Sequence, residues 1–291
     1  MKFAKYWKSI ETKVGADKYL IDPRTGKPLD PDNTFTIWGA SNESPESAMQ
    51  RAKERLRIFE KLIKSEFRDK SEYEYGFIRE EVIEEILADD GSTLAILTRN
   101  NYGAIVLNTE TVMFGDVDVD EKPPGFLGRL FGSVYKDKKF YINKIEQYQK
   151  DNPKLSIIVY ETFAGLRFVI TNRTYSMDNL DDLTEMSQLF TALEVDPLYK
   201  HLCHQQQCFR ARLTPKPWRI NIERPPNRYP RSERRKINDF EKWLRGYKRE
   251  SSLKTAVKLL KKFGNSQPHP EVRKVLKIHD KLALNQHKEL A

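Results

Sequence analysis

The segment TVMFGDVDVDE (111–121) combines an apolar run with carboxylates at every second position. Because successive side chains of a strand point to opposite faces, Asp116 and Asp118 should share one face while Val117 points into the core. Two neighbouring ionised carboxylates repel each other unless a cation lies between them. Mg²⁺ or Mn²⁺, which bind carboxylate and phosphate oxygens, would supply that cation. The alternative is an edge strand that runs into a solvated acidic loop.

A second segment, YETFAGLRFVIT (160–171), predicts a hairpin with β-branched residues on both sides of a tight turn. Thr162 precedes the turn, Gly165 allows it, and Arg167 follows it. A hydroxyl and a guanidinium would then face one site from the mouth of the hairpin. Arginine is well suited to that site, because its forked donors match phosphate oxygens.

A third segment, CFRARLTPK (208–216), predicts a strand with Arg210 and Arg212 on one face and Lys216 beyond its end. Arginines inside a sheet need an anion nearby, and a phosphate group would provide one. The alternative is that they pair with the acidic residues of 178–185.

Taken in order, GDVDV (115–119), TFAGLR (162–167) and CFRAR (208–212) resemble the three motifs of the archaeo-eukaryotic primase superfamily, which includes primase-polymerases. The first family motif is D-x-D on a strand, and the second is S-x-x-G-x-H on a hairpin. The third combines an acidic residue with basic nucleotide contacts. The resemblance covers roughly residues 75–225 and implies a core sheet related to the RNA-recognition fold.

The resemblance also implies roles for individual residues. Asp116 and Asp118 match the metal-binding pair, and Asp196 is the nearest acidic match to the third motif, with Glu223 as a weaker one. Arg167 stands where the family has histidine, so the chain would be a divergent member. The implied catalytic residues are Asp116, Asp118 and Arg167, and the implied nucleotide contacts are Thr162, Gly165, Arg167, Arg210, Arg212 and Lys216.

The implied chemistry is phosphoryl transfer that depends on Mg²⁺ or Mn²⁺. The first hypothesis is therefore a nucleotidyltransferase of the primase-polymerase type, which would use nucleoside triphosphates on a nucleic-acid template. One alternative is a catalytically inactive, nucleic-acid-binding relative of primases. Another is a metal-dependent nuclease that uses the same carboxylates. DNA and RNA remain equally open, as do initiation and extension of strands.

The elements that must position these residues follow from hydrophobic periodicity. A capped amphipathic helix is predicted within 39–67, with Ser44 or Asn42 as the cap, and strands are predicted between 75 and 119, the first leading into a short helix. From 112 to 223 the predicted order is strand, helix, hairpin, helix, strand. That order favours an α+β fold, an antiparallel sheet with helices on one face. The predicted domains are a primase-like catalytic domain (1–225), which includes an N-terminal helical and strand extension, and a basic helical C-terminal region (226–291).

Charge is unevenly distributed along the 291 residues, which carry 51 Lys and Arg, 42 Asp and Glu and a net charge of +9. From Thr214 onward there are 21 basic and 8 acidic residues, whereas residues 1–213 are slightly acidic. Such asymmetry favours an anionic polymer as partner, although solvated helix faces are the alternative. The aromatic residues interspersed in the basic region are either base-stacking or core residues: Trp218, Tyr229, Trp243 and Tyr247.

Several other classes of protein and site are disfavoured. There is no apolar run of about 20 residues and no secretory signal, so we expect no membrane partner and a cytoplasmic location. The chain lacks a P-loop and a G-x-S-x-G motif. The spacing in HLCHQQQC (201–208) matches no usual zinc pattern, so packing is expected for Cys203 and Cys208. His279 and Asp280 are expected on a surface helix.

Overall fold

The computed structural model divides the chain into two compact units, Lys2–Arg79 and Glu80–Ala291, and Met1 belongs with the second. The expected boundary near Pro225 is therefore not the division between units. The turn-rich segment 22–33 and part of the Gly/Pro-broken loop at 121–139 lie outside the described residues. The residues that the structure describes are 1–13, 34–64, 77–123, 125 and 134–291.

The smaller unit contains an antiparallel strand pair and one helix: β1 (Tyr6–Lys13), β2 (Thr34–Ser41) and α1 (Pro45–Lys64). The Ser44 hydroxyl accepts a hydrogen bond from the Ser47 amide at 3.1 Å and so caps the helix, as the sequence predicts. Gly39 lets the helix approach β2, because a Cβ there would collide with the main chain of Ala48 and Ala52. Both alanines are fully buried.

The larger unit contains two four-stranded sheets in which every neighbouring pair of strands is antiparallel. The first sheet has the order β3 (Glu81–Leu87), β4 (Thr93–Arg99), β5 (Ile105–Thr109), β9 (Phe209–Arg212). The second sheet has the order β11 (Val257–Phe263), β7 (Ile157–Thr162), β8 (Gly165–Ile170), β6 (Phe114–Asp118). A short parallel pair joins β10 (Lys254–Thr255) to β12 (Glu289–Leu290).

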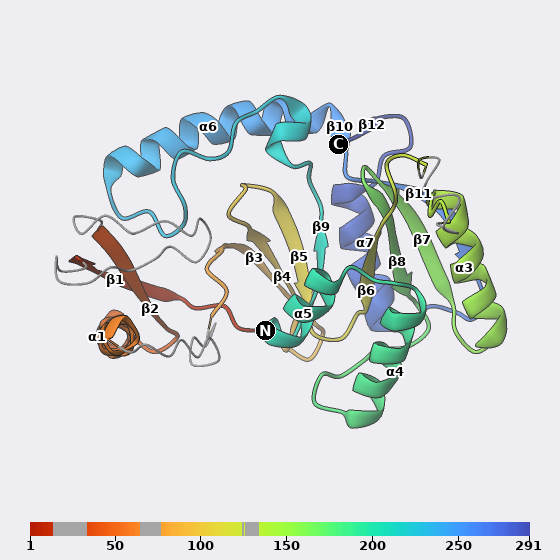
Figure 1. Cartoon of the computed structure of the whole chain (residues 1–291), viewed down its shortest axis with the longest axis horizontal. Helices are drawn as coiled ribbons and strands as arrows, with labels where there is room; N and C mark the ends of the chain where they lie inside the picture. Colours follow the sequence, from red (N-terminus) through yellow and green to blue (C-terminus); the bar gives the residue numbers. More distant parts are fainter. Residues whose placement is uncertain (14–33, 65–76, 124, 126–133) are drawn as a thin grey trace. The chain divides into compact units, whose positions relative to one another are not determined.

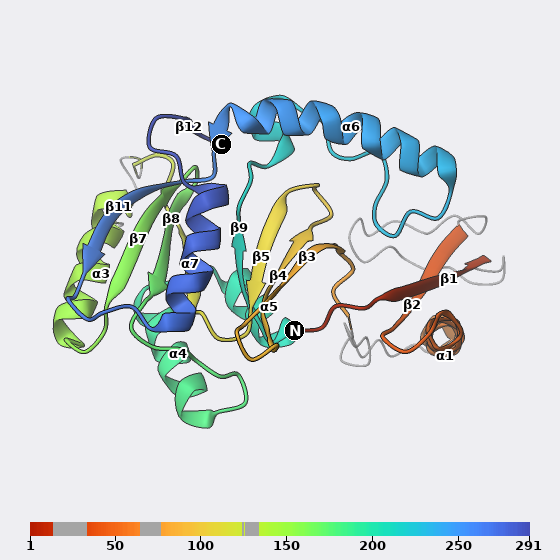
Figure 2. The ribbon, with the colours of Figure 1, turned by 180° about the vertical axis from the view of Figure 1, so that it is seen from behind.

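Helices cover both faces of the second sheet rather than the single face that the sequence predicts. α7 (Pro270–Ala283) lies on one face and α3 (Lys138–Asp151) on the other (Figures 1 and 2). One hydrophobic core joins the two sheets, with Leu97 and Leu107 of the first packed together with Phe168 of the second. The remaining helices are α4 (Leu180–Ala192), α5 (Pro197–Gln206), the short 3₁₀ helix η2 (Pro217–Ile220) and α6 (Arg234–Ser252).

The order of elements from β6 to β9 confirms the prediction of an α+β fold with antiparallel sheets, but β9 pairs with β5 in the first sheet and not with the sheet that contains β6, β7 and β8. Two further predictions are wrong. Residues 81–87 form a strand, with no helix after them, and residues 257–263 form β11 rather than a helix. β11 pairs with β7, so this part of the basic tail completes the second sheet instead of forming a separate helical region. No helix in the described part of the chain is both long and apolar enough to cross a membrane.

Candidate functional site

The paired carboxylate and guanidinium at the centre of the site come from adjacent strands. The register of β6 and β8 sets Asp116 opposite Arg167. Arg167 Nε donates to Asp116 Oδ1 at 2.8 Å, and Nη2 donates to Oδ2 at 3.3 Å. Its Nη1 donates to the carbonyl oxygen of Arg212 at 2.8 Å. The Arg167 residue is only 1% exposed, so it holds Asp116 in place and does not itself reach a ligand.

A third carboxylate is brought to β6 by the start of α5. β6 is an edge strand, and its outward carbonyl groups are satisfied by α5. The Asp196 amide donates to the carbonyl of Asp116 at 3.1 Å, and the Tyr199 hydroxyl donates to that of Phe114 at 2.9 Å. The Asp196 carboxylate caps α5 by accepting from the Leu198 amide. Asp116, Asp118 and Asp196 are called the carboxylate cluster below.

Asp118 is the exposed member of this cluster. Partial burial raises the pKa of its carboxyl group, and the negative charges of Asp196 and Asp116 raise that pKa further. Lys216 and Arg219 act in the opposite direction. Asp118 therefore lies where carboxylate repulsion and cationic attraction meet, and an additional cation bound there would relieve the repulsion.

Three basic side chains, Arg212, Lys216 and Arg219, interact electrostatically with members of the carboxylate cluster and are called the cation cluster below. Burial, and then the charges of Arg167 and Arg219, lower the pKa of Arg212 to about 10. Burial lowers the pKa of Lys216 as well, and Arg212 and Arg219 contribute to that shift. Like charges gathered this closely favour an anionic ligand. Arg219 is not among the site residues expected from the sequence. The segment KPWR, in which basic residues flank an aromatic one, could have indicated it.

His279 is the second residue that sequence reasoning missed. It is fully buried in α7, which corrects the expectation of a surface position. Its Nε2 is 3.4 Å from Arg167 Nη1, and its Nδ1 is 2.8 Å from Asp280 Oδ1, which also accepts from the Tyr160 hydroxyl. Because a guanidinium only donates, Nε2 must accept and Nδ1 must carry the hydrogen. Burial lowers the pKa of His279, so a neutral imidazole supports Arg167 from behind.

Other expected site residues lie outside the cluster or act through packing. Arg210 donates to Glu80, the residue before β3, at 2.6 Å and so forms an ion pair within the protein rather than facing a ligand. Gly165 packs directly against β6, because a Cβ there would collide with the carbonyl of Val117. Within the described part of the chain, no hydrogen bond joins the Thr162 hydroxyl to the cluster.

The structure shows the contacts of some of the acidic and aromatic residues for which the sequence leaves alternatives open. The carbonyl of Glu223 accepts a hydrogen bond from Trp243 Nε1, whereas the charge of Asp196 acts on Asp118. Trp243 stacks on Tyr247, with ring centroids 5.0 Å apart, and Tyr247 is buried. These two aromatic residues therefore belong to the packing of α6, while Trp218 is exposed.

The donor set fits a divalent cation only in part. Among the described residues, no group of three or more His, Cys, Asp or Glu side chains could hold a metal ion. Both oxygens of Asp116 already accept from Arg167, while Asp118 remains open to solvent. A cation held jointly by carboxylate oxygens and ligand phosphates fits this arrangement, and a cage made only of protein ligands does not. The same finding gives no support to a zinc site at Cys203 and Cys208, which are free, buried thiols.

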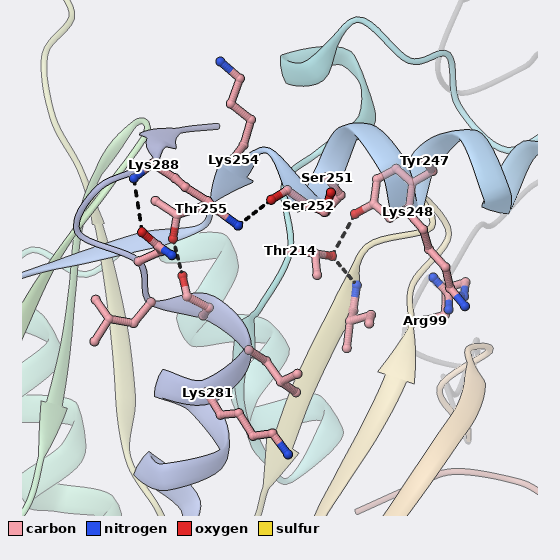
Figure 3. A pocket seen from close by; sticks show the side chains of 15 residues that line it. Arg99, Thr214, Tyr247, Lys248, Ser251, Ser252, Lys254, Thr255, Lys281 and Lys288 are labelled. Carbon is pink, nitrogen blue, oxygen red and sulfur yellow. Dashed lines mark hydrogen bonds between the residues drawn. The ribbon is translucent and has the colours of Figure 1, made fainter.

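A separate hollow of about 280 Å³ lies between the ends of α6 and α7, as Figure 3 shows. Among the residues that the structure describes, it is lined by basic, hydroxyl and apolar side chains and one asparagine, but by no carboxylate. The side chains of Lys254 and Lys281 extend away from it, and the amine of Lys288 donates to the carbonyl of Ser252. The described lining of the hollow contains none of the carboxylates that a metal-dependent reaction would need. We therefore treat the carboxylate cluster, and not the hollow, as the candidate site.

Function must be inferred from this arrangement of side chains. Comparison with protein-family models, curated proteins and solved structures found no match. Three carboxylates beside three accessible or partly buried cations suit a ligand that carries several phosphates, because such a ligand needs both a metal and basic side chains.

Proposed function

We propose that this chain is a divalent-metal-dependent nucleotidyltransferase, related to primase-polymerases, that acts on nucleic acid with nucleoside triphosphates. The observation that carries the proposal is the position of Asp118. Its carboxyl group has a raised pKa beside two other carboxylates, yet it faces Lys216 and Arg219. A carboxyl group whose pKa is shifted by both burial and specific charged neighbours is a candidate functional group.

Each residue of the site has a distinct role in this proposal. Asp116 and Asp118, with Asp196 beside them, would hold Mg²⁺ or Mn²⁺ together with substrate phosphates. When bound, the metal would lower the pKa of an attacking hydroxyl and neutralise the phosphate oxygens. The cation cluster would hold the triphosphate and stabilise the charge on the departing pyrophosphate. Arg167 is a positioning residue, since its donors hold the Asp116 carboxylate in a fixed orientation.

The test is extension of a 5′-labelled primer on a template, with nucleoside triphosphates and either Mn²⁺ or Mg²⁺, resolved on a denaturing gel. We expect lengthened products, and we expect Asp118→Asn to reduce them roughly a hundredfold or more. Glu121→Gln is the matched control, because it neutralises another exposed carboxylate three residues away. Shortened primers would instead indicate a nuclease.

A second candidate function is favoured by the ion pair between Arg167 and Asp116. That pair neutralises one carboxylate without any metal, which is compatible with a catalytically inactive relative that only binds nucleic acid. The same experiment separates the two candidates. Binding of the labelled strand without any change in its length, over DNA and RNA templates and both metals, would support the binding protein.

A further inference from the structure

An unusual group of exposed aromatic side chains lies next to the cation cluster. Tyr102 is 38% exposed, Trp218 is 42% exposed and Phe163 is 51% exposed. They come from the turn between β4 and β5, from η2, and from the turn between β7 and β8. These three residues are called the aromatic platform below.

Each member of the platform is flanked by a cation. The Arg219 guanidinium lies 4.3 Å from the ring centroid of Phe163. Arg224 lies 5.0 Å from that of Trp218 and 5.5 Å from that of Tyr102, and the Lys216 amine also lies over Trp218. Tyr102 and Trp218 contact each other edge to face, with centroids 5.2 Å apart. Aromatic and basic groups alternate along this surface.

Within the described part of the chain, the cations of the platform form no close ion pairs, although the charge of Asp118 acts on Lys216 and Arg219. Among the described residues, Lys216, Arg219 and Arg224 form no salt bridge with a carboxylate. The surface therefore offers phosphate-binding groups beside ring faces, a combination that suits unpaired bases on a phosphate backbone. A purely apolar partner would leave these cations without compensation.

The turn that carries Tyr102 of the platform is also fixed in place. The turn that carries Tyr102 is held by the Asn100 side chain, which accepts from the Tyr102 amide at 3.0 Å. Gly103 has a φ of +85° and lies so close to Trp243 of α6 that a Cβ would collide with the indole ring. A rigid surface limits the entropy lost when a base stacks on it.

We propose that the aromatic platform binds the unpaired bases of a single-stranded nucleic acid and leads that strand to the carboxylate cluster. The link between the two is direct, since Lys216 and Arg219 flank platform rings and also act on the charge of Asp118. The inference rests on the proposed function only in taking nucleic acid as the partner. It adds preference for single strands and names the residues that confer it.

The test is fluorescence anisotropy with a labelled single-stranded oligonucleotide in EDTA, without metal or nucleoside triphosphate. We expect Trp218→Ala to weaken binding roughly five- to a hundredfold, as loss of a stacked base does. Tyr135→Ala removes another exposed aromatic side chain, one with no cation over its ring among the described residues, and should bind like the parent protein. A duplex of the same sequence should bind more weakly than the single strand.

A strand of the same length with abasic sugars separates stacking from electrostatics. Trp218→Ala should bind this strand as tightly as the parent does, because there are no bases to stack. Equal binding of parent and Trp218→Ala to the normal strand would overturn the proposal, as would an equal loss on both strands. Because no turnover is involved, inactivity in primer extension leaves this result unaffected.

Discussion

Asp118, the central residue of the proposed site, should lower the free energy of unfolding of the protein. A carboxyl group whose pKa is raised in the folded protein binds its proton more tightly there than in the unfolded chain. The free energy of unfolding then falls as pH rises from the unfolded pKa to the folded one, and the penalty persists at neutral pH. Sites that perform chemistry often carry such a penalty.

Asp118→Asn should therefore stabilise the protein at pH 7, by less than about 1 kcal/mol because solvent screens an exposed group. The gain should disappear below about pH 4, where the carboxyl group is protonated in both states. Urea unfolding of both proteins from pH 3 to 8 measures it. A variant less stable than its parent at pH 7 would contradict the proposed repulsion.

Substitution of Asp116 should destabilise the protein, in contrast to substitution of Asp118, although the two residues are only two positions apart on the same strand. Asp116→Asn leaves the buried guanidinium of Arg167 without its counter-charge. We expect a loss of about 2–3 kcal/mol, below the value for a fully buried pair because Asp116 is partly exposed. Chemical unfolding at pH 7 measures this change, and a loss smaller than that of Glu121→Gln would show that the pair is not structural.

At the scale of elements, the close contact of β6 with β8 sets the geometry of the site. Gly165 lies opposite Asp118 and has no space for a side chain, since Val117 approaches its backbone. The two strands could not otherwise set Asp116 against Arg167 at hydrogen-bonding distance. The position of the glycine in the hairpin motif is thus explained by packing.

Gly165→Ala should destabilise the protein by about 1–3 kcal/mol, because the added methyl group must push β8 away from β6. Gly246→Ala in α6 is the matched control. Nothing lies within 4 Å of a Cβ at that position, and the change should stabilise the helix by about 0.5–1 kcal/mol. Thermal unfolding of both variants tests the contrast, and equal melting temperatures would contradict the packing role.

The strands and helices from β6 to β9 are predictable from sequence, because alternating Val and Ile residues and Pro or Gly breaks define them locally. β11 is not predictable in this way. VKLLKKF has the basic, Leu-rich composition of a helix, and only its pairing with β7 makes it a strand. His279 illustrates the same limit for the site, since its contact with Arg167 joins residues 112 positions apart.

On the scale of the whole molecule, we expect the basic excess of the chain to contribute to binding of the proposed nucleic-acid partner. α6 presents a row of exposed cations that includes Lys242, Arg245 and Arg249. Each cation that neutralises a phosphate adds to the salt dependence of binding, with a slope of about −0.7 per contact for single strands. The long-range field of the tail and the local stacking surface then make separable contributions to affinity.

Replacing Lys242, Arg245 and Arg249 together with Gln should reduce the slope of log K against log salt by about 2. Replacing the exposed residues Lys8, Lys53 and Arg57 of the smaller unit with Gln is the control and should leave the slope unchanged. Anisotropy titrations from 50 to about 300 mM salt measure both. An unchanged slope in the α6 variant would remove α6 from the binding surface.

The most direct measurement is the affinity for a nucleoside triphosphate with Mn²⁺ and with EDTA, in the parent protein and in Asp118→Asn. The parent should bind the triphosphate more tightly with Mn²⁺, because the metal bridges carboxylates and phosphates. Asp118→Asn should lose most of that gain, yet bind at least as tightly as the parent in EDTA, since one negative charge is gone. Affinity that is independent of Mn²⁺ in the parent, or an equal gain from Mn²⁺ in both proteins, would contradict a metal-assisted phosphate site at Asp118.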